Sequence, residues 1–171
     1  MKKISILSFL FLSFLACKKQ ENVVTPQTVI GKWNFVSAKG SMEDIYGKIT
    51  QYDTKADVNH YLELKSDGTF YTNGDGMKCS VCALGEEIFG KYSVNSTNSE
   101  IKFTYYNDGS RGLPDQILTV KLTLPSDGQF NMEINKANLI TTMKESQLSA
   151  NEIKGFEDFT KSLQVTTYLV K

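Results

Sequence analysis

Hydrophobic and polar residues alternate through most of the chain after residue 30. Between residues 118 and 124 every second residue is Leu or Val, and the residues between them are Thr or Lys. Phe130, Met132 and Ile134 alternate in the same way with polar neighbours. A period of two places one set of side chains on each face of a β-strand. The pattern therefore predicts an antiparallel sheet with one face in a core and the other in water.

The same pattern predicts eight strands before residue 145. They lie near residues 30–38, 60–65, 69–73, 87–95, 100–106, 116–124, 129–135 and 138–144. Four Asp-Gly pairs, typical of tight hairpins, lie between these runs: Asp67-Gly68, Asp75-Gly76, Asp108-Gly109 and Asp127-Gly128. Residues 41–59 are ambiguous between a further strand and a long loop. Eight antiparallel strands can close into a barrel, which removes the free edges of the sheet.

One helix is expected near the end of the chain, at about 149–163. Ser149 and Glu152 have the spacing of a capping box, in which each side chain accepts a backbone N–H of the other residue. Ile153, Phe156, Phe159 and Leu163 form an apolar stripe at helical spacing. A last strand is expected at about 164–170.

The first sixteen residues are typical of a secretory signal peptide. Lys2 and Lys3 precede an apolar segment, 4–16, that is interrupted only by serines. Thirteen helical residues would span about 20 Å, less than the roughly 30 Å hydrocarbon core of a bilayer. We therefore predict a signal peptide at 1–16; a buried core helix fits the N-terminal lysines less well.

The segment Phe14-Leu15-Ala16-Cys17 resembles the lipobox of bacterial lipoproteins, although Phe14 stands where Leu is usual. The resemblance implies that Cys17 carries acyl chains, such as palmitate, which anchor the protein to a membrane. Residues 17–27 would then be a lipidated N-terminus and tether. Lys18 in place of Asp implies the outer rather than the inner membrane of a bacterial cell envelope.

Charge and composition exclude some classes of protein. Lys plus Arg and Asp plus Glu each number 19, so the formal net charge is zero and the chain lacks the basic excess of a nucleic-acid-binding protein. Hydrophobic residues make up 40% of the chain, enough for a core.

Residues 28–171 resemble a lipocalin-like domain. The resemblance is carried by Gly31-Lys32-Trp33, by residues 61–70 (YLELKSDGTF) and by residues 90–94 (GKYSV). It implies an all-β fold: an up-and-down antiparallel barrel of eight or nine strands, with Gly31 and Trp33 packed at its base. Lipocalins commonly place an arginine over this tryptophan. The only arginine here is Arg111, so this cover is either absent or supplied by Lys161 or Lys171.

Cys79 and Cys82 form a C-x-x-C pair with three possible roles. A redox pair favours a helix N-terminus, and a zinc site needs two such pairs or two histidines. The chain has one histidine, His60, and the pair precedes a predicted strand. A local disulfide in an oxidising compartment is the interpretation that we favour.

We found no catalytic, phosphate-binding or metal-binding motif, so we predict no enzymatic activity, no catalytic residue, no cofactor and no metal. Two functions remain. The first is binding of a small hydrophobic ligand inside the barrel. Five large side chains are candidates to line such a site: Phe35, Phe70, Tyr92, Phe103 and Phe130. The second is a structural or interaction lipoprotein that presents loops 41–59, 73–86 and 107–115 to another envelope protein.

Overall fold

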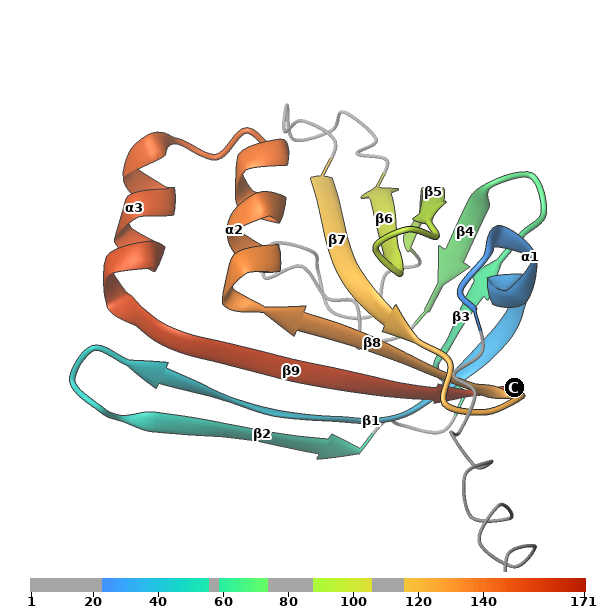
Figure 1. The fold of residues 1–171 in the computed structure, drawn as a ribbon, viewed down its shortest axis with the longest axis horizontal. Coiled ribbons are helices and arrows are strands. Elements are labelled where there is room, and N and C mark those ends of the chain that lie inside the picture. Colours follow the sequence, from blue (N-terminus) through green and yellow to red (C-terminus); the bar gives the residue numbers. More distant parts are fainter. Residues whose placement is uncertain (1–22, 56–58, 74–87, 106–115) are drawn as a thin grey trace, which may run out of the picture.

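The computed structural model describes residues 23–55, 59–73, 88–105 and 116–171. Three helices and nine strands lie in these ranges (Figure 1). The strands are β1 (Gly31–Asp44), β2 (Ile49–Lys55), β3 (Tyr61–Leu64), β4 (Thr69–Thr72), β5 (Ile88–Asn95), β6 (Glu100–Tyr105), β7 (Gln116–Thr123), β8 (Gln129–Asn135) and β9 (Thr160–Val170). The helices are α1 (Pro26–Val29), α2 (Lys136–Glu145) and α3 (Ala150–Phe159).

The predicted antiparallel barrel is confirmed. The sheet has the order β2-β1-β3-β4-β5-β6-β7-β8-β9, and an additional pairing of β1 with β9 closes it. Eight strands, β1 and β3 to β9, thus form the barrel, and β2 is an extra strand beside β1. The predicted strands match the observed ones closely from β3 to β8, because each has one inward and one outward face along its whole length.

β1 is longer than predicted because a bulge at Val36 divides it into two halves. Residues 31–34 pair with β3, whereas residues 37–43 pair with β2 along the same edge. The register with β9 shifts between Phe35 and Ser37. Inward-facing residues are therefore odd-numbered before the bulge, such as Trp33, and even-numbered after it, such as Gly40. The ambiguous segment 41–59 holds the rest of β1 and all of β2.

The second half of β1, β2 and the first half of β9 project beyond the barrel as a three-stranded ribbon (Figure 1). We call residues 37–44, 49–55 and 160–168 the ribbon; residues 164–168 also pair with β8, so this part of the ribbon belongs to the barrel wall, and only the far end projects beyond it. Gly40 lies in the middle of it, between Tyr52 and Val165. A Cβ atom on Gly40 would lie 2.0 Å from the carbonyl oxygen of Gln164, so only glycine fits where these strands approach.

The predicted strand at 138–144 is wrong, because these residues belong to helix α2. Asn135 begins the helix, and its side chain accepts the backbone N–H of Asn138. The helix lies beside the first half of β7 (Figure 1). The hydroxyl of Thr142 accepts the backbone N–H of Thr119 at 3.1 Å, and that of Ser146 accepts the N–H of Ile117 at 3.0 Å. Hydroxyl groups of α2 and of Ser146, the residue that ends it, thus form hydrogen bonds with the part of the β7 edge that does not pair with β8.

Helix α3 is shorter than the predicted 149–163. It covers Ala150–Phe159, and the predicted capping box between Ser149 and Glu152 is present. Leu163 belongs to β9, which begins at Thr160 rather than near residue 164. The pairing of Thr160 with Asp44 in β1 ends the helix, because these residues enter the sheet.

Candidate functional site: the two ends of the barrel

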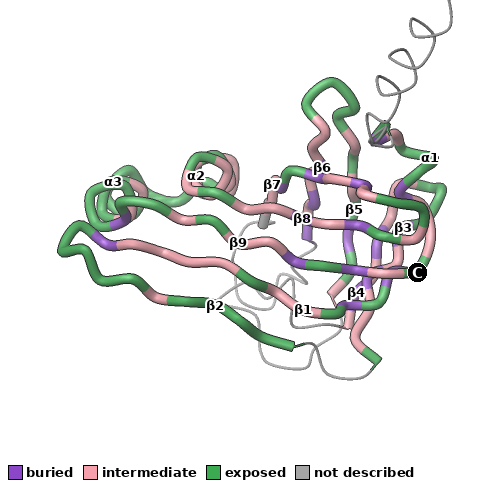
Figure 2. The backbone as a smooth tube through the Cα atoms, turned by 60° about the horizontal axis from the view of Figure 1, so that its bottom comes forward, coloured by how far each residue is buried: buried purple, intermediate pink, exposed green. Residues whose placement is uncertain are grey.

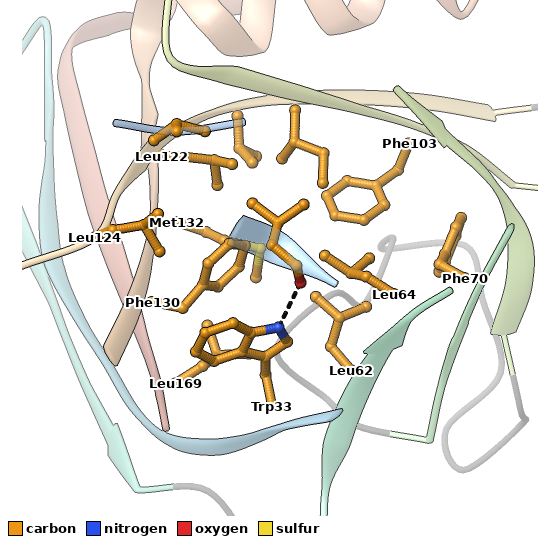
Figure 3. Packing of buried hydrophobic residues seen from close by; sticks show 14 of the residues in the cluster. Trp33, Leu62, Leu64, Phe70, Phe103, Leu122, Leu124, Phe130, Met132 and Leu169 are labelled. Carbon is orange, nitrogen blue, oxygen red and sulfur yellow. Dashed lines mark hydrogen bonds between the residues drawn. The ribbon is translucent and has the colours of Figure 1, made fainter. Parts of the chain in front are cut away.

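Trp33 and α1 close one end of the barrel, which we call the plugged end. The ring of Trp33 is 1% exposed and stacks on Phe130 with ring centroids 5.0 Å apart (Figure 3). Its Nε1 donates a hydrogen bond of 2.7 Å to the carbonyl oxygen of Val29, the last residue of α1. The structure thus places Trp33 in core packing at the barrel base.

Lys171 covers the Trp33 ring from outside. Its Nζ lies 4.7 Å from the ring centroid, within the range of a cation–π interaction. Lys161, the other candidate, lies in the ribbon and pairs with Glu43 at 2.6 Å. Gly31 lies next to Lys171 and has a φ of +134°. A Cβ atom added to Gly31 would lie 3.5 Å from the Cε of Lys171. Of the two lysines that the sequence offers, Lys171 therefore covers the ring.

A pocket of about 470 Å³ lies outside the plug, between α1 and the β7–β8 connection. Its lining mixes apolar groups of Val23 and Leu124 with the polar side chains of Gln27, Asp127 and Lys171. Trp33 lines the inner side of this pocket and is almost fully buried. This hollow is therefore a surface feature of the plugged end.

The five side chains proposed to line a ligand site occupy different depths of the barrel. Phe130 belongs to the plug, and Phe70 and Phe103 pack edge to face in the middle with centroids 5.0 Å apart. Phe35 is 8% exposed and is the last inward residue of β1 before the bulge. All four are part of the buried core.

Tyr92 has a structural role at the plugged end. Its hydroxyl donates a hydrogen bond of 2.7 Å to the carbonyl oxygen of Lys65 in the β3–β4 hairpin. Partial burial, followed by the negative charge of Asp67, raises the pKa of the Tyr92 hydroxyl, which therefore stays protonated as a donor. Hydrogen bonds from Thr69 lower the pKa of the Asp67 carboxyl in the same hairpin.

Along β7, β8 and β9, burial of the inward side chains falls from the plugged end toward the other end, which we call the open half; on β6, Tyr105 stays buried at that end. Along β9, Leu169 is 1% exposed and Thr167 is 7% exposed, whereas Val165 is only half-buried. The same change occurs along β8 from Phe130 to Ile134. It also occurs along β7, where Leu122 and Val120 are buried and Leu118 is half-buried. Figure 2 shows most buried residues gathered near α1.

Two buried oxygen atoms near the helices have no hydrogen-bond partner in the described part of the chain. They are Oδ1 of Asn138, in the first turn of α2, and Oγ1 of Thr160, at the end of α3. Lys136 Nζ donates to the carbonyl oxygens of Glu157 and Thr160 and so ties the two helices together. An unpaired buried acceptor typically costs about 1–3 kcal/mol. Both atoms lie beside the helices, away from the plug.

Several predicted sites lie outside the described residues: the signal peptide 1–16, Cys17, and the pair Cys79 and Cys82. His60 is half-buried before β3, and its carbonyl oxygen accepts the N–H of Phe35 at 2.9 Å. Within the described ranges, no group of three or more His, Cys, Asp or Glu side chains could hold a metal ion. Each helix in those ranges falls short of the length and apolar character needed to cross a bilayer.

The fold and these two ends define a class of protein: an eight-stranded antiparallel β-barrel, plugged at one end, with an extra strand and a ribbon at the other. Comparisons with protein-family models, curated proteins and solved structures found no match.

Proposed function

We propose that this chain is a lipid-anchored protein of the bacterial cell envelope, similar to lipocalins, that binds a small hydrophobic ligand in the open half of its barrel. The proposed activity is binding without catalysis. The observation that carries it is the burial gradient on β7, β8 and β9: their inward apolar side chains are buried near Trp33 and only half-buried toward the opposite end. A closed eight-stranded barrel has room inside for side chains or for one small ligand.

Among the five candidate residues, Phe35 is the best placed for ligand contact, because it is the most exposed of the four buried phenylalanines, at 8%, and the last inward residue of β1 before the bulge. Phe70 and Phe103 would form the floor of the site. Further candidates to line the site are Leu118, Ile134 and Val165. The alternation of residues predicts that they face inward, but it does not separate residues that line a cavity from residues of the packed core. Phe130 and Tyr92 support the barrel from the plugged end.

The proposed anchor gives the barrel an orientation. Five residues, 18–22, separate Cys17 from Val23, and an extended chain covers at most about 3.5 Å per residue. Val23 lines the pocket outside the plug. A short tether would therefore hold the plugged end within about 20 Å of the membrane, and the open half would face away from it.

Mass spectrometry of the native full-length protein, purified in mild detergent, tests the ligand. We expect a co-purifying apolar small molecule, or a thermal shift with one member of a panel of fatty acids and lysophospholipids. Val165→Trp should fill the open half and abolish binding. Thr166→Trp, the neighbouring change on the outer face, should leave it intact. The absence of both a bound molecule and any thermal shift contradicts the proposal.

The anchor has a separate test. Cys17→Ser should release the protein from sedimented membranes, whereas Lys18→Ser, next to it, should leave the protein bound. A Cys17→Ser protein that sediments as before would show that no lipid is attached there.

One observation favours the second candidate, an interaction lipoprotein. The predicted loop 41–59 is mostly ribbon, and its tip exposes apolar side chains: Ile45 is 54% exposed, Tyr46 83% and Ile49 58%. Exposed apolar groups close together are typical of contact surfaces. In that case Tyr46→Ser should reduce recovery of a second envelope protein after cross-linking in cells, and ligand binding should be unaffected.

A further inference from the structure

β2 presents an open edge along the ribbon. Among the described strands, β2 stands at the end of the sheet order and has β1 as its only neighbour (Figure 1). The hairpin begins with a hydrogen bond of 3.1 Å from the N–H of Asp44 to the carbonyl oxygen of Lys48. Hydrogen-bonded and non-bonded pairs then alternate along the register. The backbone groups of Ile49, Gln51, Asp53 and Lys55 therefore point away from β1.

This edge is exposed and carries little protection. Six of the seven residues of β2 are exposed, and Thr50 is half-buried. Charged side chains usually protect such edges from pairing with another chain. The charged side chains of β2 are Asp53 and Lys55, of opposite sign, and Asp53 is held by Lys39 at 3.8 Å. The strand therefore has no net charge that would repel a second copy.

We infer that β2 pairs with β2 of a second copy of this chain, antiparallel, about a twofold axis at Tyr52. Residues 50 and 54 of the two copies then lie opposite each other, as do 51 and 53, and 49 and 55. The outward backbone groups of Ile49, Gln51, Asp53 and Lys55 meet their counterparts in hydrogen-bonded pairs. The ribbons of both copies join into one continuous sheet.

The side chains of β2 are complementary to themselves in this register. On the outer face, Gln51 lies opposite Asp53 of the second copy and can donate to its carboxylate. Ile49 lies opposite the aliphatic part of Lys55. On the inner face, Thr50 meets Thr54, and the two Tyr52 rings are neighbours. Aromatic, Thr–Thr and polar cross-strand pairs of this kind stabilise antiparallel sheets.

Neighbouring registers are less favourable. An axis at Asp53 would place two carboxylates directly opposite each other, which is destabilising. An axis at Gln51 would leave Thr54 and Lys55 without a partner strand. Tyr52, which is 37% exposed, also lies directly opposite Gly40 in β1, which offers it no side chain to pack against. The second Tyr52 would supply that contact on its other side.

Cysteine cross-linking of the full-length chain tests both the pairing and its register. Opposite residues in a non-hydrogen-bonded pair have Cα atoms about 4.5 Å apart, within the range of a disulfide. Tyr52→Cys should therefore give a disulfide-linked dimer under mild oxidation. Thr50→Cys or Thr54→Cys alone should not, whereas a mixture of these two variants should. The unsubstituted chain controls for its own cysteines.

Charge variants provide a second test that leaves the hairpin intact. Gln51→Glu would face Asp53 and should weaken dimerisation about tenfold. Gln51→Lys should strengthen it. The same two changes at Gln129, an exposed residue at the plugged end, should have no effect. Dimerisation is measured by sedimentation of the detergent-solubilised protein over a range of concentrations.

The inference does not depend on the ligand or the lipid anchor. A monomer at every concentration overturns it. So does efficient cross-linking of Thr50→Cys alone, because that result requires another register. If the Tyr52→Cys protein does not fold, the mixture of Thr50→Cys and Thr54→Cys tests the same register, because residues 50 and 54 of the two copies lie opposite each other. A monomer that pairs through β2 only with a different protein also overturns it.

Discussion

The plugged end and the ribbon use the same two strands in different ways. At the plug, β1 and β9 lie within a closed circle, and side chains from every direction cover Trp33 and Leu169, each 1% exposed. In the ribbon the same strands have one covered face, and Val165 is only half-buried. Figure 2 shows buried residues on β9 near the plugged end and half-buried or exposed residues along the middle of the strand. Stability at the plug comes from side-chain burial, whereas the ribbon depends more on backbone pairing and helix contacts.

The largest expected effect comes from the plug. Trp33→Ala removes a buried ring and leaves a cavity, so it should lower the free energy of unfolding by about 3–5 kcal/mol. Tyr46→Ala, at the exposed tip of the ribbon, should change it by less than about 0.5 kcal/mol. Urea denaturation measures both. Equal losses would show that the two regions do not differ as we describe.

The next effect concerns the contact of α2 with β7. Thr142→Val removes the hydroxyl that accepts the N–H of Thr119, at nearly constant volume, and should cost about 1–3 kcal/mol. The exchange of the Thr119 amide hydrogen should also become faster. Thr141→Val is the matched control, because the Thr141 hydroxyl is exposed and bonds only within the helix, to Ala137. Unchanged exchange at Thr119 would contradict this role of α2.

Lys171→Met should have a smaller effect, about 0.5–1 kcal/mol, because it removes one cation over the Trp33 ring. Trp33 is the only tryptophan in the chain, so fluorescence emission reports on it alone. The emission should shift in Lys171→Met and stay unchanged in Lys161→Met. A shift in both variants would mean that the plug and the ribbon are not independent.

The smallest effect is a pH dependence at helix α3. Hydrogen bonds from the Ser149 hydroxyl and backbone N–H lower the pKa of the Glu152 carboxyl. A lowered pKa in the folded state adds stability above the ordinary pKa of glutamate, and this stability is lost as pH falls through the lowered value. Glu152→Gln should therefore make the acid dependence of Tm less steep.

Ser149→Ala provides a partial control for Glu152, because it removes the hydrogen bond from the Ser149 hydroxyl and leaves the one from the backbone N–H. It should flatten the profile less than Glu152→Gln does, and the double variant should match Glu152→Gln alone. An acid profile of Glu152→Gln identical to that of the unsubstituted protein would contradict the prediction.

The alternation of residues predicts the barrel because most strands keep one face inward throughout. It fails for the second half of β1, because the bulge at Val36 moves the inward positions from odd to even numbers. It also fails for residues 138–144, where Ile140, Thr141 and Thr142 favour a strand by propensity. There the contacts of Thr142 and Ser146 with β7, distant in sequence, stabilise a helix instead.

The sequence predicts the candidate site only in part, because alternation gives the face of a strand on which a residue lies but not its depth in the barrel. The sequence marks Phe35, Phe103 and Tyr92 as inward-facing, but depth along the barrel depends on how the strands are staggered. It therefore cannot tell that the Tyr92 hydroxyl reaches Lys65 while Phe35 borders the open half. That Lys171 rather than Lys161 covers Trp33 is likewise decided by the register of β9 with β1.

The bulge at Val36 also limits how β1 can change in length. On either side of it, one added or lost residue would turn every following side chain over, from the interior to water. Insertions and deletions elsewhere in β1 are therefore tolerable only in pairs. At Val36 itself, the loss of one residue would remove the bulge and leave both halves of β1 paired with β9 as before, with the same side chains facing inward.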